Sequence, residues 1–260
     1  MSRRAFAFLI FAFVVSAGCI RLGFWQLDRL RQRRATNAML VDRLSSPPRD
    51  VRDVIRDSKN AAFRRASATG TYDFANEFAL AARTREGSPG VNLLTPMRVA
   101  GTDTAVLVNR GWVYAPDAMT VDFKRWIEPA DASVTGYLVA IARGVRGSAS
   151  AATNPRVVRH LDLDSLTRRL PYPVVPFVLV ETDSVPAAAS TPAALASSTT
   201  PATKPARLSL PVLDEGPHLG YAFQWFAFAF IGLVGAAFGI RADRRGTWRR
   251  GSHRAQRTAG

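Results

Sequence analysis

The stretch that decides the fold is HLGYAFQWFAFAFIGLVGAAFGI, residues 218–240. After its first residue, His218, it continues for 22 residues without a charge. A helix of that length is about 33 Å long, which is enough to cross the roughly 30 Å hydrocarbon core of a bilayer. Because lipid offers the backbone no hydrogen-bond partners, a single span must be helical. The sequence therefore predicts a transmembrane helix over residues 218–240.

A basic tail, residues 241–260, follows this span and contains seven arginines and one aspartate. Asp214 and Glu215 precede the span on its other side. Since positive charge collects on the cytoplasmic side of membrane proteins, this bias predicts a cytoplasmic C-terminus, or a matrix C-terminus if the protein is mitochondrial.

A second apolar stretch near the start of the chain predicts another transmembrane helix over residues 5–25. With two spans, both termini are cytoplasmic and the region between the spans is extracytoplasmic. Four arginines between residues 29 and 34 argue for the opposite orientation, but the charge difference across the second span is larger. An alternative interpretation is a cleaved lipoprotein signal in which Cys19 is lipidated.

The region between the spans divides by its periodicity. Residues 26–45 continue a helical pattern as an amphipathic extension of the first span. Residues 60–183 predict a compact antiparallel β domain, with one minor helix over residues 162–170. Turns are expected at residues 87–90 and 101–103, and strands are expected at 65–72, 77–83, 92–99, 104–113, 134–142 and 174–181. Residues 184–210, rich in Ala, Ser, Thr and Pro, predict a linker.

The predicted fold class is therefore an α+β membrane protein in which two transmembrane helices flank one extracytoplasmic antiparallel β domain. The net charge of +15 is concentrated partly in the tail, and no aromatic-interleaved basic motif indicates nucleic acid as a partner. The single cysteine excludes an internal disulfide. No phosphate loop, nucleophile elbow or paired acid–base set is present, so we do not expect an enzyme.

Five short patterns occur in order along the chain: LGFWQLDR at 22–29, FRR at 63–65, LTP at 94–96, VLVNRGWV at 106–113 and HLGYAFQWF at 218–226. In this order and spacing the chain resembles the Surfeit-locus family of cytochrome c oxidase assembly factors, including the bacterial Shy-type members. The resemblance covers about residues 20–240. The chain departs from the family's pattern at Gly216 and Pro217, where an Asn pair is common.

The resemblance implies a multi-pass protein of the inner (plasma) membrane that helps to build haem-copper cytochrome c oxidase. It implies delivery or protection of haem a for the catalytic subunit, and no turnover chemistry. The implied partners are that catalytic subunit, haem a synthase and membrane lipids.

His218 is the principal candidate site residue, because it lies at the mouth of the second span and imidazole is a common axial ligand of haem iron. The resemblance supports this assignment. Tyr221, Trp225 and Phe226 are predicted to share roughly one helical face with His218 and to pack a porphyrin. Arg110 is a candidate for pairing with a haem propionate or an oxidase carboxylate. The alternative interpretation is an interfacial histidine with an ordinary aromatic belt, and a structural Arg110.

Two functions stay open at this point. The first is an assembly factor that handles haem a, for which His218 is required. The second is a haem-independent, membrane-tethered scaffold that stabilises oxidase subunits during assembly. A membrane-anchored hydrolase of the cell envelope has no residue set to support it.

Overall fold

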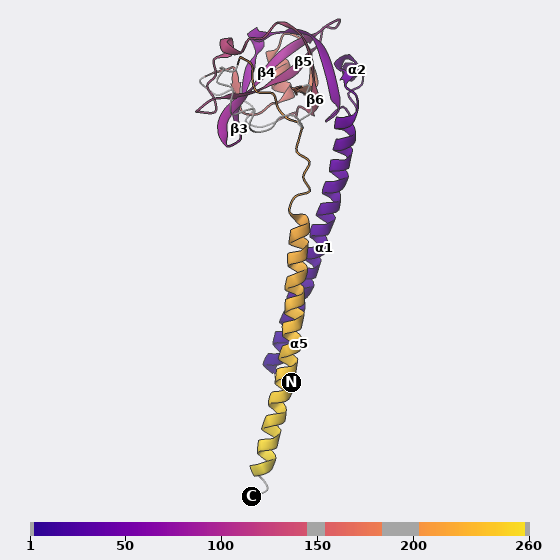
Figure 1. The fold of residues 1–260 in the computed structure, drawn as a ribbon, viewed down its shortest axis with the longest axis vertical. Helices are drawn as coiled ribbons and strands as arrows, with labels where there is room; N and C mark the ends of the chain where they lie inside the picture. Colours follow the sequence, from indigo (N-terminus) through magenta and orange to yellow (C-terminus); the bar gives the residue numbers. More distant parts are fainter. Residues whose placement is uncertain (1–2, 145–153, 184–202, 258–260) are drawn as a thin grey trace. The chain divides into compact units, whose positions relative to one another are not determined.

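The computed structural model describes the backbone of residues 3–144, 154–183 and 203–257. Figure 1 shows the long helices α1 and α5 and a β domain. The chain divides into two compact units. One comprises Met1–Met39 with Leu213–Gly260, and the other comprises Leu40–Val212.

The first unit is built from α1 (Arg3–Ser45) and α5 (His218–Arg257). Both helices contain a segment long and apolar enough to cross a membrane, Phe6–Ser45 in α1 and His218–Arg241 in α5. One continuous helix occupies the predicted first span and its amphipathic extension, so the expected division at residue 25 is not a break in structure. Within that extension, Val41 is exposed rather than part of a buried face.

The two long helices pack through a seam of small side chains. On α1 one row of buried positions has spacings of four and three residues and comprises Ala12, Ser16, Cys19, Gly23 and Gln26. A Cβ atom on Gly23 would lie 2.6 Å from the Phe226 ring. A Cβ atom on Gly232 would lie 2.6 Å from Ser16 Oγ. Small residues permit this close approach, which is how helices associate in lipid, where apolar side chains gain little by leaving their surroundings.

The second unit contains a closed five-stranded barrel. Its strands, in order around the sheet, are β2 (Arg65–Tyr72), β6 (Asp131–Ala140), β8 (Val174–Glu181), β5 (Ala105–Tyr114) and β4 (Ser88–Val99). β4 pairs again with the end of β2, and this pairing closes the ring. Closure leaves the five strands with few unpaired edges.

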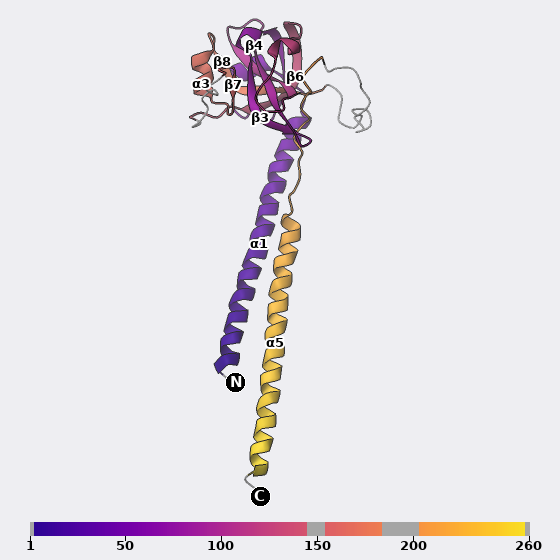
Figure 2. The ribbon, with the colours of Figure 1, turned by 90° about the vertical axis from the view of Figure 1, so that its left-hand side faces the viewer.

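Short elements surround the barrel. β3 (Phe78–Arg85) and β7 (Val157–Val158) extend the sheet from β4, and β1 (Arg49–Asp50) pairs with the start of β2. The remaining elements are α2 (Val51–Arg56), η1 (Phe74–Asn76), η2 (Phe123–Trp126) and α3 (Leu163–Arg169). The side chain of Asp162 caps α3 by accepting from Ser165 N, and α3 lies beside β8 (Figure 2).

The sheet is mixed, so the prediction of an antiparallel domain was wrong for three strand pairs. β5–β8, β1–β2 and β3–β7 run parallel. A parallel pair needs a crossover connection, and α3 lies in the segment that leads into β8. Local periodicity predicts a strand but not its direction relative to a distant partner.

Two predicted boundaries also shift. β4 begins at Ser88, so the turn is confined to Glu86 and Gly87, both with positive φ, instead of residues 87–90. Of the predicted linker 184–210, residues 184–202 lie outside the described part of the chain. The later part is not free: Pro205 is buried, and Leu208 packs against the apolar core.

The barrel interior is apolar along most of its length. Inward residues of all five strands form one cluster, which Val51 and Val54 of α2 also join. A second cluster covers the outer face of β5 and β8 and includes Leu163 and Leu166 of α3. Because both faces of these strands are buried, they are rich in Val and Leu rather than alternating between apolar and polar residues.

Candidate functional site

His218 is the first residue of α5, and its ring is held by the neighbouring helix. His218 Nδ1 lies 2.9 Å from Gln26 Oε1 of α1. An amide oxygen only accepts hydrogen bonds, so this contact requires a proton on Nδ1. In the tautomer with its single proton on Nδ1, the lone pair lies on Nε2. Metal-binding histidines are oriented in the same way, by a hydrogen bond at one ring nitrogen.

The Nε2 edge of this ring faces a glycine. Gly216 has φ +68°, and a Cβ atom on it would lie 3.4 Å from His218 Cδ2 and 3.5 Å from Nε2. No described residue hydrogen-bonds Nε2. Because Gly216 has no side chain, none from this position contacts the Nε2 edge. An imidazole nitrogen is a donor type that haem iron accepts.

The aromatic residues of the span differ in their contacts. Tyr221 is 48% exposed. Phe226 meets Phe24 of α1 edge to face at 5.4 Å, whereas Trp225 is half-buried and packs against Phe228 at 5.9 Å. Tyr221 and Trp225 both keep some exposed surface.

The turn before α5 is tied to α1 by charge. Arg34 forms a bidentate pair with Glu215 at 2.8 Å, and Arg33 approaches Asp214 at 3.8 Å. Asn37 Nδ2 also donates to Asp214 O at 2.9 Å. These contacts fix the approach to His218. They also pair two of the basic residues that follow the first span with acidic residues that precede the second.

Arg110 lies in the core of the β domain rather than at the membrane end of a helix. The β4–β5 register shifts between Leu93 and Leu94, leaving Arg110 as the extra residue of a β-bulge. Gly111 has φ +132°, and Asn109 Oδ1 accepts from Gly111 N at 3.1 Å. The bulge turns the Arg110 side chain inward, where it is 0% exposed.

The Arg110 guanidinium is fully engaged by protein groups. Nε donates to Thr95 Oγ1 at 2.8 Å, and Nη1 donates to Trp126 O at 2.7 Å and Glu128 Oε2 at 2.8 Å. Nη2 donates to Glu77 Oε1. Enclosed in this way, Arg110 has no surface with which to reach a propionate or an oxidase carboxylate. The structure instead supports the alternative interpretation, in which Arg110 is structural.

A second arginine, Arg207, joins this charge cluster. Its Nη2 lies 2.8 Å from Glu128 Oε1 and 3.0 Å from Glu181 Oε1, and its Nη1 donates to Arg110 O. The cluster thus contains three carboxylates and two guanidiniums in or near the barrel interior. Sequence analysis missed Glu77, Glu128, Glu181 and Arg207. The available signal was an acidic residue at the end of a valine-rich strand, which is Glu181.

The cluster shifts the ionisation of its members in opposite directions. Burial raises the pKa of Glu181 to about 7, an effect that Arg207 opposes and the charge of Glu128 adds to. Burial also acts to raise the pKa of Glu128, but hydrogen bonds and charge from Arg207 and Arg110 outweigh it and hold this pKa below its usual value. Burial and the charge of Glu181 raise the pKa of Tyr72.

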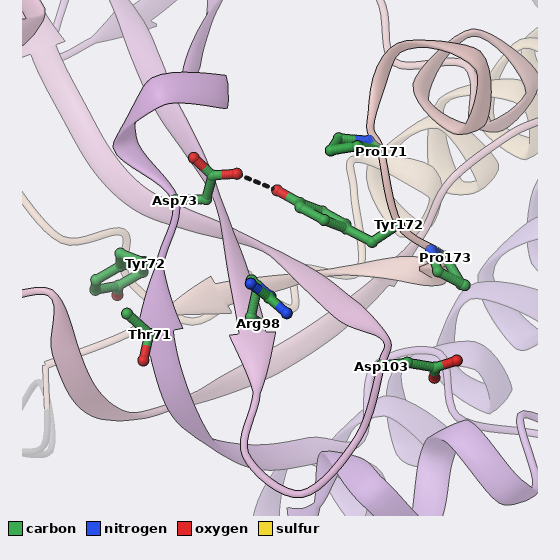
Figure 3. A pocket seen from close by; sticks show the side chains of 8 residues that line it. All are labelled: Thr71, Tyr72, Asp73, Arg98, Asp103, Pro171, Tyr172 and Pro173. Carbon is green, nitrogen blue, oxygen red and sulfur yellow. Dashed lines mark hydrogen bonds between the residues drawn. The ribbon is translucent and has the colours of Figure 1, made fainter.

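The β domain also has a polar hollow of about 710 Å³ at the ends of β2 and β4. Figure 3 shows Arg98 among the lining side chains, between Tyr72 and Tyr172. Tyr172 donates to Asp73 Oδ2 at 2.7 Å, and Asp73 also accepts from Asn76. These groups satisfy one another, and the described lining residues form no set of nucleophile, base and orienting group.

Comparison with known proteins places most of the chain in one family. The model of the SURF1 family matches residues 13–230. A SURF1-like protein from Monosiga brevicollis is 33% identical over 114 residues, which are 40% of this chain and 43% of that protein. A SURF1-like protein from Rickettsia bellii (strain RML369-C) is 30% identical over 95 residues, 36% of this chain and 38% of that protein. The matches thus span about two fifths of the length of these curated relatives.

Proposed function

The chain belongs to the SURF1 family, and on that premise we propose that it is a membrane-anchored assembly factor for haem-copper cytochrome c oxidase. In this proposal it binds haem a through His218 and aids its delivery to the catalytic subunit. It acts by binding and positioning, not as an enzyme. The proposed partners are that subunit, haem a synthase and membrane lipids.

The main observation behind the proposal is the hydrogen bond between His218 Nδ1 and Gln26 Oε1. Gln26 accepts from Nδ1, which leaves Nε2 as the ring nitrogen available to a ligand. If haem were bound, His218 would hold it through this nitrogen, and the iron would accept the nitrogen as a ligand. Gln26 is a positioning residue, because it fixes the tautomer and the orientation of the ring without touching the porphyrin.

The aromatic residues on α5 support a porphyrin-sized ligand. Tyr221 and Trp225 follow His218 by three and seven residues, and both retain surface that α1 does not cover. Aromatic rings bury a large apolar area and stack against flat ligands. In this proposal they hold the macrocycle while His218 orients it. Arg110 takes no part.

The chain is proposed to reside in the inner membrane with both termini in the cytoplasm and the β domain outside. The basic tail after the second span supports this orientation. Arg33 and Arg34, which count against it, are partly offset by their pairs with Asp214 and Glu215.

We also propose that the first anchor is retained rather than cleaved before Cys19. Cleavage there would remove Ala12 and Ser16, two buried residues of the seam with α5.

The test is the absorbance spectrum of the full chain purified in detergent from cells that make haem a. We expect a haem a band in the native protein that is lost in His218→Ala and weakened about 10–100-fold in affinity in Gln26→Leu. His160→Ala is the matched control, because His160 is exposed on the β domain. An unchanged band in His218→Ala contradicts the ligand assignment. Absence of haem from all forms, with oxidase assembly still dependent on the protein, supports a haem-independent scaffold instead.

A further inference from the structure

Residues 203–208 belong to the segment that leads to α5, yet part of this segment is seated on the β domain. Ala206 forms an isolated antiparallel bridge with Trp112 of β5. Trp112 N donates to Ala206 O at 2.8 Å, and Ala206 N donates to Trp112 O at 2.9 Å. Pro205 is buried on one side of this bridge, and Leu208 packs on the core on the other.

The surface of β5 that contacts this segment fits it closely. A Cβ atom on Gly111 would lie 2.4 Å from Ala206 O, so only glycine leaves room for the bridge. The same bulge that turns Arg110 inward exposes the Trp112 backbone to Ala206. The fit between the segment and β5 is therefore specific, although it uses only two backbone hydrogen bonds.

The side chain of Arg207 adds ion pairs between this segment and the barrel. Its side chain is 13% exposed and joins Glu128 and Glu181, which come from different parts of the barrel. Without Arg207, two carboxylates that are mostly buried would lose a counter-ion, so the ion pairs hold the segment more strongly than the bridge alone. Lys204, by comparison, is 65% exposed and lies 3.9 Å from Glu128, where solvent screens its charge.

We propose that residues 205–208 form a releasable latch that sets the length of the chain joining the β domain to α5. With the latch closed, nine residues, 209–217, connect the two, and they reach at most about 30 Å. With the latch open, the connection begins after Glu181 and has 36 residues, 182–217, with a reach of roughly 120 Å. Release thus makes this connection about four times as long.

The charged surroundings make the latch sensitive to protons. The titratable and charged groups that face Glu181 are Arg207 and Lys204 of the latch segment, Glu128 after η2, Arg110 of β5 and Tyr72 of β2. Burial raises the Glu181 pKa to about 7, and the charge of Arg207 acts against this rise, so closure of the latch favours the ionised carboxylate. Protonation of Glu181 removes its ion pair with Arg207, so the closed state weakens as pH falls through about 7.

The latch can be tested by hydrogen exchange and mass spectrometry on the full chain in detergent, with rates corrected for the intrinsic effect of pH. We expect Arg207→Gln to speed exchange at Ala206 and Trp112 at least tenfold, while the β2–β6 pairing keeps its protection. Lys204→Gln is the matched control from the same segment and should leave both amides unchanged. In the native chain, protection of these two amides should rise between pH 6 and pH 8 as Glu181 ionises, and Glu181→Gln should remove this dependence.

Three outcomes would overturn the inference. The first is exchange at Ala206 in the native chain as fast as in an unstructured peptide. The second is loss of protection throughout the barrel in Arg207→Gln, because the segment would then be an inseparable part of the fold. The third is a pH dependence that survives in Glu181→Gln. None of these measurements requires haem, so they test the latch independently of the proposed function.

Discussion

Replacing Arg110 with methionine tests whether the buried charge cluster holds the β domain together. The substitution keeps most of the side-chain length but removes the charge and four hydrogen bonds, to Thr95, Trp126 O, Glu128 and Glu77. Glu77 is 0% exposed, so its carboxylate would stay buried after losing its closest counter-ion. Arg156 lies 3.9 Å from the other oxygen of Glu77 and compensates only in part.

Removal of one partner from a buried ion pair costs about 3–5 kcal/mol. For a unit of the size of Leu40–Val212, each kcal/mol lowers Tm by about 2–4 °C. We therefore expect Arg110→Met to lower the Tm of the β domain by roughly 10 °C. Differential scanning calorimetry of the full chain in detergent measures this shift.

Arg98→Met is the matched control, because Arg98 is an exposed arginine on the adjacent strand β4. The double variant Glu77→Gln with Arg110→Met should recover part of the loss, since it removes the uncompensated charge. A Tm for Arg110→Met within about 2 °C of the control, on the same scale of Tm change per kcal/mol, would refute the conclusion that Arg110 is structural.

Three further predictions concern pH, the helix seam and a helix cap. Because folding raises the Glu181 pKa, this residue stabilises the β domain less as pH rises through about 7. Because folding lowers the Glu128 pKa, that residue stabilises the domain less as pH falls below about 4.5. The free energy of unfolding, measured with urea from pH 4 to pH 9, should therefore have a maximum between these limits, and a flat profile would contradict this. In a Cys19→Ser background, Ser16→Cys with Gly232→Cys should form a disulfide when an oxidant is added, because the two Cβ atoms would be 3.9 Å apart. The control pair, Ser16→Cys with Gly235→Cys, should not form one. Equal disulfide yields from the two pairs would disprove the seam between α1 and α5. Asp162→Ala should lower stability by about 1 kcal/mol through loss of the α3 cap, measured as a Tm shift of about 2–4 °C, and the exposed Asp164→Ala should change it less.

Of the hydrogen-bonded pair His218 and Gln26, only His218 was predicted from the sequence. His218 was recognised because a histidine at the mouth of an uncharged helix is unusual, and that signal is local. Its partner Gln26 is 192 positions away, and no periodicity connects the two residues. Arg110 was predicted as a ligand-binding residue because its motif, VNRGW, does not reveal that a bulge turns the side chain into the barrel.

The sequence by itself determined the two apolar helices, the approximate positions of the main strands, the family and the candidate histidine. All of these depend on composition or on short-range patterns, which persist in any compact arrangement of the chain. The tertiary structure alone decided the barrel closure, the parallel β5–β8 pair, the buried cluster around Arg110 and the seating of Arg207 against Glu128 and Glu181. These features join residues far apart in sequence, and they form only when burial leaves charges and backbone groups no partner except one another.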